Sequence, residues 1–337
     1  MPRVLDAGVV LHARYRVREL VAEGGMGAVY RAEDLRLAGR ECALKEVRYQ
    51  EDGGISLDEA REQFYREAST LARLDHPNLP KVSDHFSENG RDYLVMDFVP
   101  GPDLQAMVEQ AQAEGRHLSE KQVLEWARQL CDALGYLHEQ QPPVLHRDIK
   151  PANIRLALTG LVKLVDFGLV KLMVQDETRT VTVVHGRGTA HYTPLEQYGG
   201  ETGHTDRRSD IYALGATLYH LLTGQAPPSA KDRFLRPGVL TPPQELNPTI
   251  TERTDRAVLW AMAMHPDQRP ASLKVFQEVL LGDAELPATP TVGAPAALAV
   301  SLPSWGEAFR SNMLLLLLAL LALGAAAYVS LVPIVLP

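Results

Sequence analysis

The sequence has little cysteine, with only Cys42 and Cys131 among 337 residues. Two cysteines far apart form no disulfide framework, and no C-x-x-C pair provides metal-ligand spacing. The N-terminus has no uninterrupted apolar run, so no secretory signal is predicted there. An excess of positive charge is also missing, because the formal net charge is −8. We therefore expect a reducing compartment and no nucleic acid as a partner.

Charge is absent from residues 313–332, which read MLLLLLALLALGAAAYVSLV. On the order of 20 apolar residues cross a bilayer as a helix, and a globular helix is rarely apolar on every side for that length. We therefore predict a transmembrane helix at 313–332, preceded by a Pro/Ala-rich linker over 283–312. Arg310, just before the span, favours a cytoplasmic position for the preceding chain. So little chain follows the span that we expect almost no extracytoplasmic part.

The rest of the chain divides at about residue 100. Before that point the pattern is strand-rich with one strong helix, and after it the pattern is mostly helical. Ser119 is a predicted N-cap, and a second long helix is expected at 210–222 with one apolar side. The inner face of the helix after Ser119 is expected to comprise Val123, Ala127, Leu130, Leu134 and Leu137. An α+β fold with a small β-rich lobe, a larger helical lobe and a cleft between them is indicated.

The strong helix of the first lobe carries a carboxylate within an apolar stripe. Steps of three and four residues place five side chains on one face: Ala60, Phe64, Glu67, Leu71 and Leu74. A buried carboxylate needs a cation or donors, although Glu67 at the rim of the stripe could instead reach water. Lys45, in the predicted strand CALK, is the candidate partner. A lysine aimed by a glutamate would neutralise phosphate charge, whereas an edge-strand lysine would lie in water.

Two further stretches carry chemistry. In AEGGMGAV, residues 22–29, glycines between two strands would let the backbone close over a phosphate, although ordinary hairpins share this pattern. The second stretch is HRDIKPAN, residues 146–153, which contains Asp148, Lys150 and Asn153. The motif DFG follows at 166–168 and adds the carboxylate of Asp166. These groups suit proton transfer from a hydroxyl, charge stabilisation of a moving phosphoryl group, and magnesium binding. So many elements in order disfavour a merely polar loop.

Over roughly residues 11–282 these stretches together resemble the eukaryotic-like serine/threonine protein kinases of bacteria. The resemblance implies a two-lobed protein-kinase fold, with the N-lobe at about 11–96 and the C-lobe at about 100–282. It also implies ATP and Mg²⁺ as cofactors and Ser/Thr hydroxyls of proteins as acceptors, since a lysine follows the catalytic aspartate.

Residue roles come with the resemblance. Asp148 would be the catalytic base, Lys150 would contact the γ-phosphate, and Lys45 paired with Glu67 would hold the α- and β-phosphates. Magnesium would bind Asn153 and Asp166. Adenine would bind backbone groups of Asp97 and Val99. The residues expected to contact the nucleotide are Val21, Ala22, Glu23, Gly24, Gly25, Met26, Gly27, Val29, Ala43, Lys45, Asp97 and Val99.

The resemblance extends to supporting residues and to two departures. Met96 would line the back of the pocket, Thr189 would shape the acceptor site, Asp210 would brace the catalytic loop, and Glu196 would pair with Arg269. Ala22 replaces the first glycine of the phosphate loop and Leu195 departs from the A-P-E pattern. A pseudokinase therefore stays open as an alternative, as does a kinase for small molecules or lipids, although the protein-substrate platform expected at 188–196 argues against the latter.

Thr178, Thr180 and Thr182 are candidate phosphorylation sites. A phosphate there would order its loop by pairing with an arginine, for which Arg147 is the expected partner. They could equally be ordinary loop threonines. Which threonine is modified, the protein substrates, the activating signal and a possible homodimer stay open.

Overall fold

A computed structural model describes residues 4–24, 27–49, 56–166, 189–198 and 205–285. The chain divides into two compact units, Met1–Leu286 and Pro287–Pro337, and every described residue belongs to the first unit. None of the helices within the described ranges is long and apolar enough to cross a membrane. The predicted transmembrane helix and residues 286–312 of the predicted linker lie outside these ranges.

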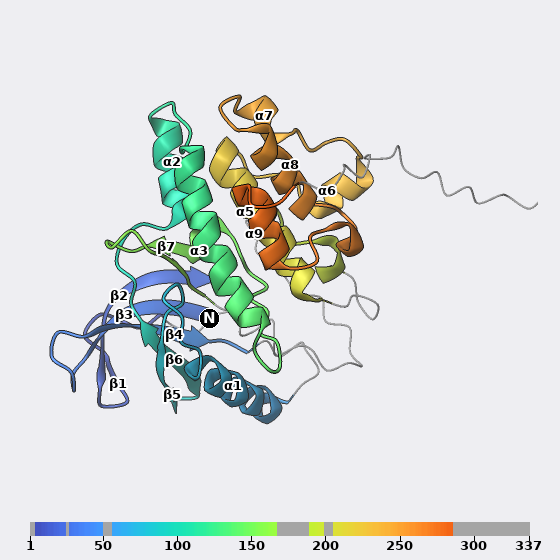
Figure 1. Ribbon diagram of the computed structural model, residues 1–337. Coiled ribbons are helices and arrows are strands. Elements are labelled where there is room, and N and C mark those ends of the chain that lie inside the picture. The colour runs from blue at the N-terminus through green and yellow to red at the C-terminus, as the bar shows by residue number, and fades with distance from the viewer. Residues whose placement is uncertain (1–3, 25–26, 50–55, 167–188, 199–204, 286–337) are drawn as a thin grey trace, which may run out of the picture. The chain divides into compact units, whose positions relative to one another are not determined.

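The first lobe is a six-stranded antiparallel sheet in the order β1-β2-β3-β4-β6-β5, with helix α1 (Leu57–Ala72) against it (Figure 1). The strands are β1 Val10–Leu11, β2 Tyr15–Gly24, β3 Gly27–Asp34, β4 Glu41–Val47, β5 Val82–Glu88 and β6 Arg91–Asp97. Burial alternates strictly along β3, which is the period of a strand with two different faces. One sheet face closes a small core with Tyr30 and Leu44, and the other joins Phe64 of α1 to the main core.

The second lobe is helical around one two-stranded sheet. Its helices are α2 Leu104–Ala113, α3 Glu120–His138, α5 Arg207–Thr223, α6 Ala230–Leu235, α7 Pro243–Leu246, α8 Glu252–Ala261 and α9 Leu273–Leu281. Short 3₁₀ turns lie at η2 Pro151–Asn153, η3 Leu195–Gln197 and η4 Pro266–Gln268, and strands β7 Ile154–Leu156 and β8 Val162–Leu164 pair antiparallel. In Figure 1 these helices lie together above the sheet of the first lobe.

The predicted helices form, with one difference. The Ser119 side chain accepts a hydrogen bond from the backbone of Gln122, which confirms the predicted N-cap, and the whole predicted inner face of α3 is buried. The second predicted helix, α5, was expected to be apolar on one side. Instead every residue from Ser209 to Thr223 is buried, because α5 packs against α2, α3, α7 and α8 and presents no side to water.

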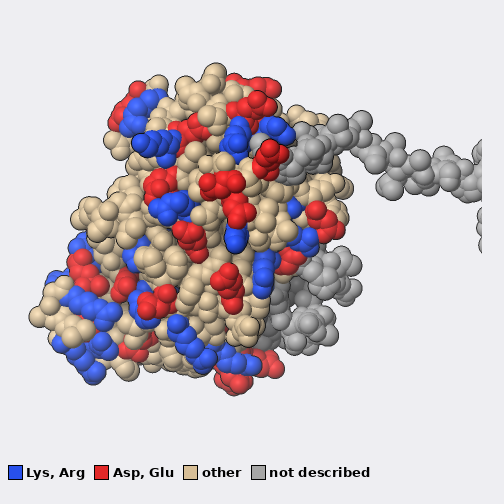
Figure 2. All heavy atoms as spheres, in the orientation of Figure 1, with Lys and Arg blue, Asp and Glu red and all other residues tan. Residues whose placement is uncertain are grey.

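Charged side chains of both signs mix over the exposed sheet of the first lobe (Figure 2). Arg31 on β3 contacts Glu19 at 3.0 Å and Glu41 at 2.5 Å on the two flanking strands. Such cross-strand pairs give a sheet face small increments of stability and keep it soluble. The chemically distinctive residues lie instead between the two lobes.

Candidate active site

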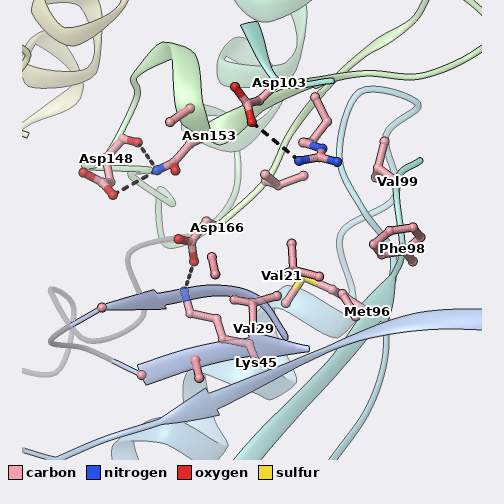
Figure 3. A pocket seen from close by; sticks show the side chains of 18 of the residues that line it. Val21, Val29, Lys45, Met96, Phe98, Val99, Asp103, Asp148, Asn153 and Asp166 are labelled. Carbon is pink, nitrogen blue, oxygen red and sulfur yellow. Dashed lines mark hydrogen bonds and ion pairs between the residues drawn. The ribbon is translucent and has the colours of Figure 1, made fainter. Parts of the chain in front are cut away.

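A cavity of about 460 Å³ lies where the two lobes meet. Strands β2, β3, β4 and β6 line it from the first lobe, and η2, β7 and the residues around Asp166 line it from the second (Figure 3). Most predicted nucleotide and catalytic residues line it, namely Val21, Ala22, Glu23, Gly24, Gly27, Val29, Ala43, Lys45, Asp97, Val99, Asp148, Lys150, Asn153 and Asp166. Gly25, Met26, Thr178, Thr180 and Thr182 lie outside the described residues.

The glycine-rich turn joins β2 to β3 at the register pair Gly24 and Gly27. Gly27 has a φ of +144°, and a Cβ there would lie 1.8 Å from the carbonyl oxygen of Glu46. Glycine is therefore required at this position by both conformation and space. Gly24 has no such neighbour within 4 Å. Ala22, where the resemblance led us to expect glycine, pairs with Val29 directly after a register shift between Leu20 and Ala22.

Strand β4 carries Lys45 into the cavity beside Ala43, as the strand period predicted. The Lys45 ammonium forms an ion pair with Asp166, drawn in Figure 3. The Lys45 side chain is 10% exposed and that of Asp166 38%, so the lysine is nearly enclosed while its carboxylate partner also reaches solvent. The pair brings together one residue from each lobe.

The predicted pair of Lys45 with Glu67 is not formed in this structure. Glu67 accepts a hydrogen bond from Gln63 at 3.1 Å, and its Oε2 is buried without a hydrogen-bond partner in the described part of the chain. Burial raises the pKa of this carboxyl to about 7, although the Gln63 hydrogen bond and the charge of Arg147 act in the opposite direction. Glu67 is thus on the inner side of its helix, as predicted, but turned towards the catalytic loop.

The position of α1 explains this difference. Arg61 lies 3.3 Å from the buried carboxylate of Asp92, and the Tyr65 hydroxyl lies 2.5 Å from that of Ser87. Both contacts tie α1 to strands β5 and β6. These contacts fix the position of Glu67 on α1. Lys45 on β4 pairs with Asp166 instead.

The catalytic-loop residues form one hydrogen-bonded cluster on the second-lobe side of the cavity. Lys150 Nζ lies 3.0 Å from Asp148 Oδ2 and 3.1 Å from the hydroxyl of Thr189. The side-chain amide of Asn153 donates to the carbonyl oxygen of Asp148 at 2.8 Å and to its Oδ2 at 2.9 Å. The Asp148 carboxylate is therefore held in one orientation by two neighbours from its own loop.

Asp210 on α5 holds the backbone of this loop by hydrogen bonds, as expected. Its carboxylate accepts the backbone N–H of His146 at 2.9 Å and of Arg147 at 2.8 Å, and lies 2.8 Å from His138 Nε2. Burial alone would raise the pKa of Asp210, but the hydrogen bonds and the charge of His138 outweigh it and lower the pKa. A buried, ionised carboxylate thus fixes the backbone just before Asp148.

Oxygen ligands for a divalent cation are in place. Because the Asn153 nitrogen is used by Asp148, its side-chain carbonyl oxygen is left as an acceptor, and Asp166 supplies a carboxylate. In the described ranges, no group of three or more His, Cys, Asp or Glu side chains could hold a metal. Two protein oxygens suit Mg²⁺, which keeps several waters and takes further ligands from substrate phosphates.

The short 3₁₀ turn η3, which precedes α5 in the chain, carries Glu196 of the second predicted pair. The guanidinium of Arg269 contacts both oxygens of Glu196, at 2.6 and 3.0 Å, and the Arg269 side chain is fully buried. Ser209 donates a further hydrogen bond to Glu196. Burial would raise the pKa of Glu196, but these hydrogen bonds lower it. This confirmed pair anchors the chain that follows Thr189 to the helical core.

Two residues of the site escaped sequence reasoning. Arg155 and Asp103 both line the cavity and lie 3.6 Å apart. Arg155 follows the catalytic loop directly, on β7, and Asp103 is the N-cap of α2. Both were missed because no local pattern in the sequence shows that β7 and the start of α2 meet.

The β-rich lobe, the helical lobe and the charged cluster between them define the two-lobed kinase fold. The family model described as "Protein kinase domain" matches residues 15–278, and the chain belongs to this family.

Curated relatives are serine/threonine-protein kinases by name. A probable serine/threonine-protein kinase of Streptomyces coelicolor is 34% identical over 304 residues, covering 85% of this chain and 43% of the relative. The DNA damage-responsive serine/threonine-protein kinase RqkA of Deinococcus radiodurans is 37% identical, covering 80% and 39%. PknB of Mycobacterium tuberculosis is 34% identical, covering 77% and 41%. The chain thus spans about two fifths of the length of these relatives.

Solved structures agree on the fold. The structure described as the apo form of PpkA-294 matches with a TM-score of 0.64 and 28% identity, covering 82% of this chain and 99% of that one. The kinase domain of PknI from Mycobacterium tuberculosis matches with a TM-score of 0.61 and 28% identity, covering 83% and 100%.

Proposed function

We propose that this protein is an ATP-dependent protein kinase that transfers the γ-phosphoryl group to serine or threonine hydroxyls of proteins. The observation that carries the proposal is the hydrogen-bonded cluster of Asp148, Lys150, Asn153 and Thr189 beside the cavity that Lys45 and Asp166 also line. The names of the relatives support the class of acceptor.

Each residue has a chemical task in this reaction. Asp148 orients the acceptor hydroxyl and receives its proton while the hydroxyl oxygen bonds to the γ-phosphorus and ADP leaves. Lys150, between Asp148 and Thr189, stabilises the charge on the transferring phosphoryl group. Lys45 holds the nonreacting phosphates. Lys150 contacts both Asp148 and Thr189. This arrangement supports an acceptor hydroxyl, carried by a bound protein segment, beside Thr189.

The residues also fit a magnesium ion, with Asp166 and the Asn153 carbonyl oxygen as its protein ligands. A bound Mg²⁺ would neutralise charge on the β- and γ-phosphates. Asp166 contacts Lys45 in this structure, so a metal held by Asp166 would lie beside the lysine proposed to hold the phosphates.

The pseudokinase alternative predicts nucleotide binding without transfer. The full chain, incubated with Mg²⁺, γ-labelled ATP and a generic protein substrate, is expected to place label on serine or threonine. Asp148→Asn and Asp166→Asn should abolish it. Asp132→Asn is the matched control, because Asp132 lies on α3, is 44% exposed and does not line the cavity. Nucleotide binding with no label in the parent protein would favour the pseudokinase.

For the parts outside the described residues, the proposal rests on sequence alone. Residues 313–332 would anchor the protein in a membrane as a single-pass helix, with the kinase domain cytoplasmic. Removing 313–337 should release the protein from membranes and leave nucleotide binding intact. Membrane association that survives this truncation would place the anchor elsewhere.

Autophosphorylation at Thr178, Thr180 or Thr182 is also proposed, since a phosphate there could pair with an arginine of the catalytic loop. Mass spectrometry of the active protein should find phosphate on at least one of them. Unmodified threonines at all three positions in active protein would exclude this means of activation.

A further inference from the structure

The cations that line the cavity lie in two different places. Lys45 and Lys150 contact Asp166 and Asp148, which is the end proposed to hold phosphates. Arg155 also lines the cavity, but it contacts the chain that connects the two lobes. A charged side chain at this connecting end needs its own explanation, because the nearby wall from the first lobe is apolar, with Val21, Ala43 and Met96.

The backbone holds Arg155 against the connecting chain. Leu156 N–H donates to the carbonyl of Pro102 at 2.9 Å, so β7 and this chain run side by side. Gly101 makes the approach possible, since its φ is +118° and a Cβ would lie 2.1 Å from the carbonyl oxygen of Leu156. Ile154 is fully buried, and the strand period turns Arg155 to the opposite face, where the cavity lies.

The edge of the guanidinium is occupied. Arg155 Nη2 donates to the Gly101 carbonyl at 2.6 Å, and Nη1 lies 3.6 Å from Asp103 Oδ2. The other Asp103 oxygen caps α2 by accepting Ala106 N–H at 2.9 Å, which fixes the carboxylate in turn. Figure 3 shows Asp103, with this ion pair drawn, across the pocket from Val21 and Val29. These contacts use the edge of the guanidinium, which leaves its flat face as the part available to a ligand in the cavity that Arg155 lines.

We propose that Arg155 is a specificity-determining residue for the base of the nucleotide. A purine base, bound where the cavity meets the chain that connects the lobes, would lie between the apolar side chains of the first lobe and Arg155. The guanidinium of Arg155 would stack on the face of the purine ring. Planar guanidinium groups stack on aromatic rings, whereas an ammonium offers no such plane. This inference rests on the proposed function, because it takes a nucleotide as the ligand of the cavity.

The size of the effect follows from the chemistry. Loss of one cation–π contact corresponds to a rise in the dissociation constant of roughly two- to thirtyfold. The rise should depend on the base, since inorganic triphosphate has no ring to stack. A general electrostatic role of Arg155 would weaken both ligands alike, and a role only in folding would lower the melting temperature of the ligand-free protein.

The test uses the full chain with Mg²⁺, titrated calorimetrically with ADP and, separately, with inorganic triphosphate. Arg155→Met keeps the length and apolar stem, and Arg155→Lys keeps the charge without the plane. We expect both variants to raise the Kd for ADP two- to thirtyfold, while the Kd for triphosphate changes less than twofold. The melting temperatures of the ligand-free variants should match that of the parent within about 2 °C, which corresponds to a few tenths of a kcal/mol in stability.

Three results would overturn the inference: an unchanged Kd for ADP in Arg155→Met, full recovery in Arg155→Lys, or equal losses for ADP and triphosphate. Failure of the parent protein to bind ADP would remove both this inference and the proposed function. A parent protein that binds ADP but transfers no labelled phosphate would contradict the proposed function only, and the base-dependent comparison would still decide the role of Arg155.

Discussion

Two carboxylates, the fully buried Asp210 and the half-buried Glu67, act on the same arginine of the catalytic loop, and their surroundings differ. Asp210, from the helical lobe, accepts two backbone N–H groups and contacts His138, and its pKa is lowered. Glu67, from α1 of the first lobe, has one hydrogen bond from Gln63, and its pKa is raised to about 7. The charge of each carboxylate acts on Arg147 to raise its pKa, against a burial that lowers it.

The contrast shows that the half of the site in the helical lobe is already assembled. Asp148, Lys150 and Asn153 have their partners before any nucleotide is considered. The half in the first lobe is incomplete, because the predicted pair of Lys45 and Glu67 is not formed and Lys45 contacts Asp166 instead. A carboxylate that burial keeps partly protonated is a weak partner for Arg147 and costs little to withdraw. The predictions that follow test this difference between the lobes.

The largest effect is expected at Asp210. Asp210→Ala would leave the N–H groups of His146 and Arg147 and the ring of His138 buried without their acceptor. Removing one partner of such a network costs about 3–5 kcal/mol in the free energy of unfolding. Denaturant unfolding of the full chain measures this loss. Asp132→Ala, at the exposed face of α3, should change stability by less than about 0.5 kcal/mol, and a similar loss in both variants would contradict the comparison.

A somewhat smaller loss is expected at Arg269, which anchors the same lobe. Arg269→Lys keeps the charge but cannot contact both oxygens of Glu196, so we expect a loss of about 2–3 kcal/mol. The matched control is Arg128→Lys, because Arg128 contacts both oxygens of Glu125 from a position that is 45% exposed. Its effect should stay below about 0.5 kcal/mol. Equal losses in the free energy of unfolding for the two variants would mean that burial does not determine how much an arginine–glutamate pair stabilises the fold.

Residues whose roles depend on neighbours in the chain were predictable from the sequence. Asp148, Lys150 and Asn153 lie on one short loop, so their spacing alone places them together, and the N-cap at Ser119 needs only the next helical turn. The two-lobed fold followed from a change of period near residue 100. The pairing of Glu196 with Arg269 is long-range and came from the family resemblance.

The rest depended on how separate elements pack. Periodicity placed Glu67 on the inner face of α1, but its partner depends on contacts of Arg61 and Tyr65 with β5 and β6. The complete burial of α5 depends on its neighbours in the helical core. Arg155 had no signal at all, because its role arises only where β7 meets the chain between the lobes.

A pH-dependent effect is expected at Glu67. With a pKa near 4.5 unfolded and about 7 folded, the carboxyl is protonated in both states at low pH. As the pH rises from 4.5 through 7, the unfolded chain ionises first, so this residue costs stability, by about 2 kcal/mol above pH 7 after allowance for partial exposure. Glu67→Gln should therefore match the parent near pH 4.5 and exceed it at pH 8 in denaturant unfolding.

The control for this prediction lies on the same helix. Glu62 is 71% exposed, so Glu62→Gln should shift stability by the same small amount at both pH values. A difference between Glu67→Gln and the parent that does not change with pH would mean that Glu67 is paired in solution, and the contrast with Asp210 would fail.

The smallest effects test whether α1 is less tightly coupled to the fold than α3. Ser56 and Ser119 each cap a helix by accepting a backbone N–H three residues on, and at Ser56 the Glu59 carboxylate also accepts the Ser56 backbone N–H. Ser119→Ala should lower the free energy of global unfolding by about 1 kcal/mol, the usual value of such a cap. Ser56→Ala should lower it by about half as much, because the start of α1 opens without the core. Hydrogen exchange should instead quicken in the first turn of α1. Equal global losses, without faster local exchange, would show that the two lobes hold their helices equally firmly.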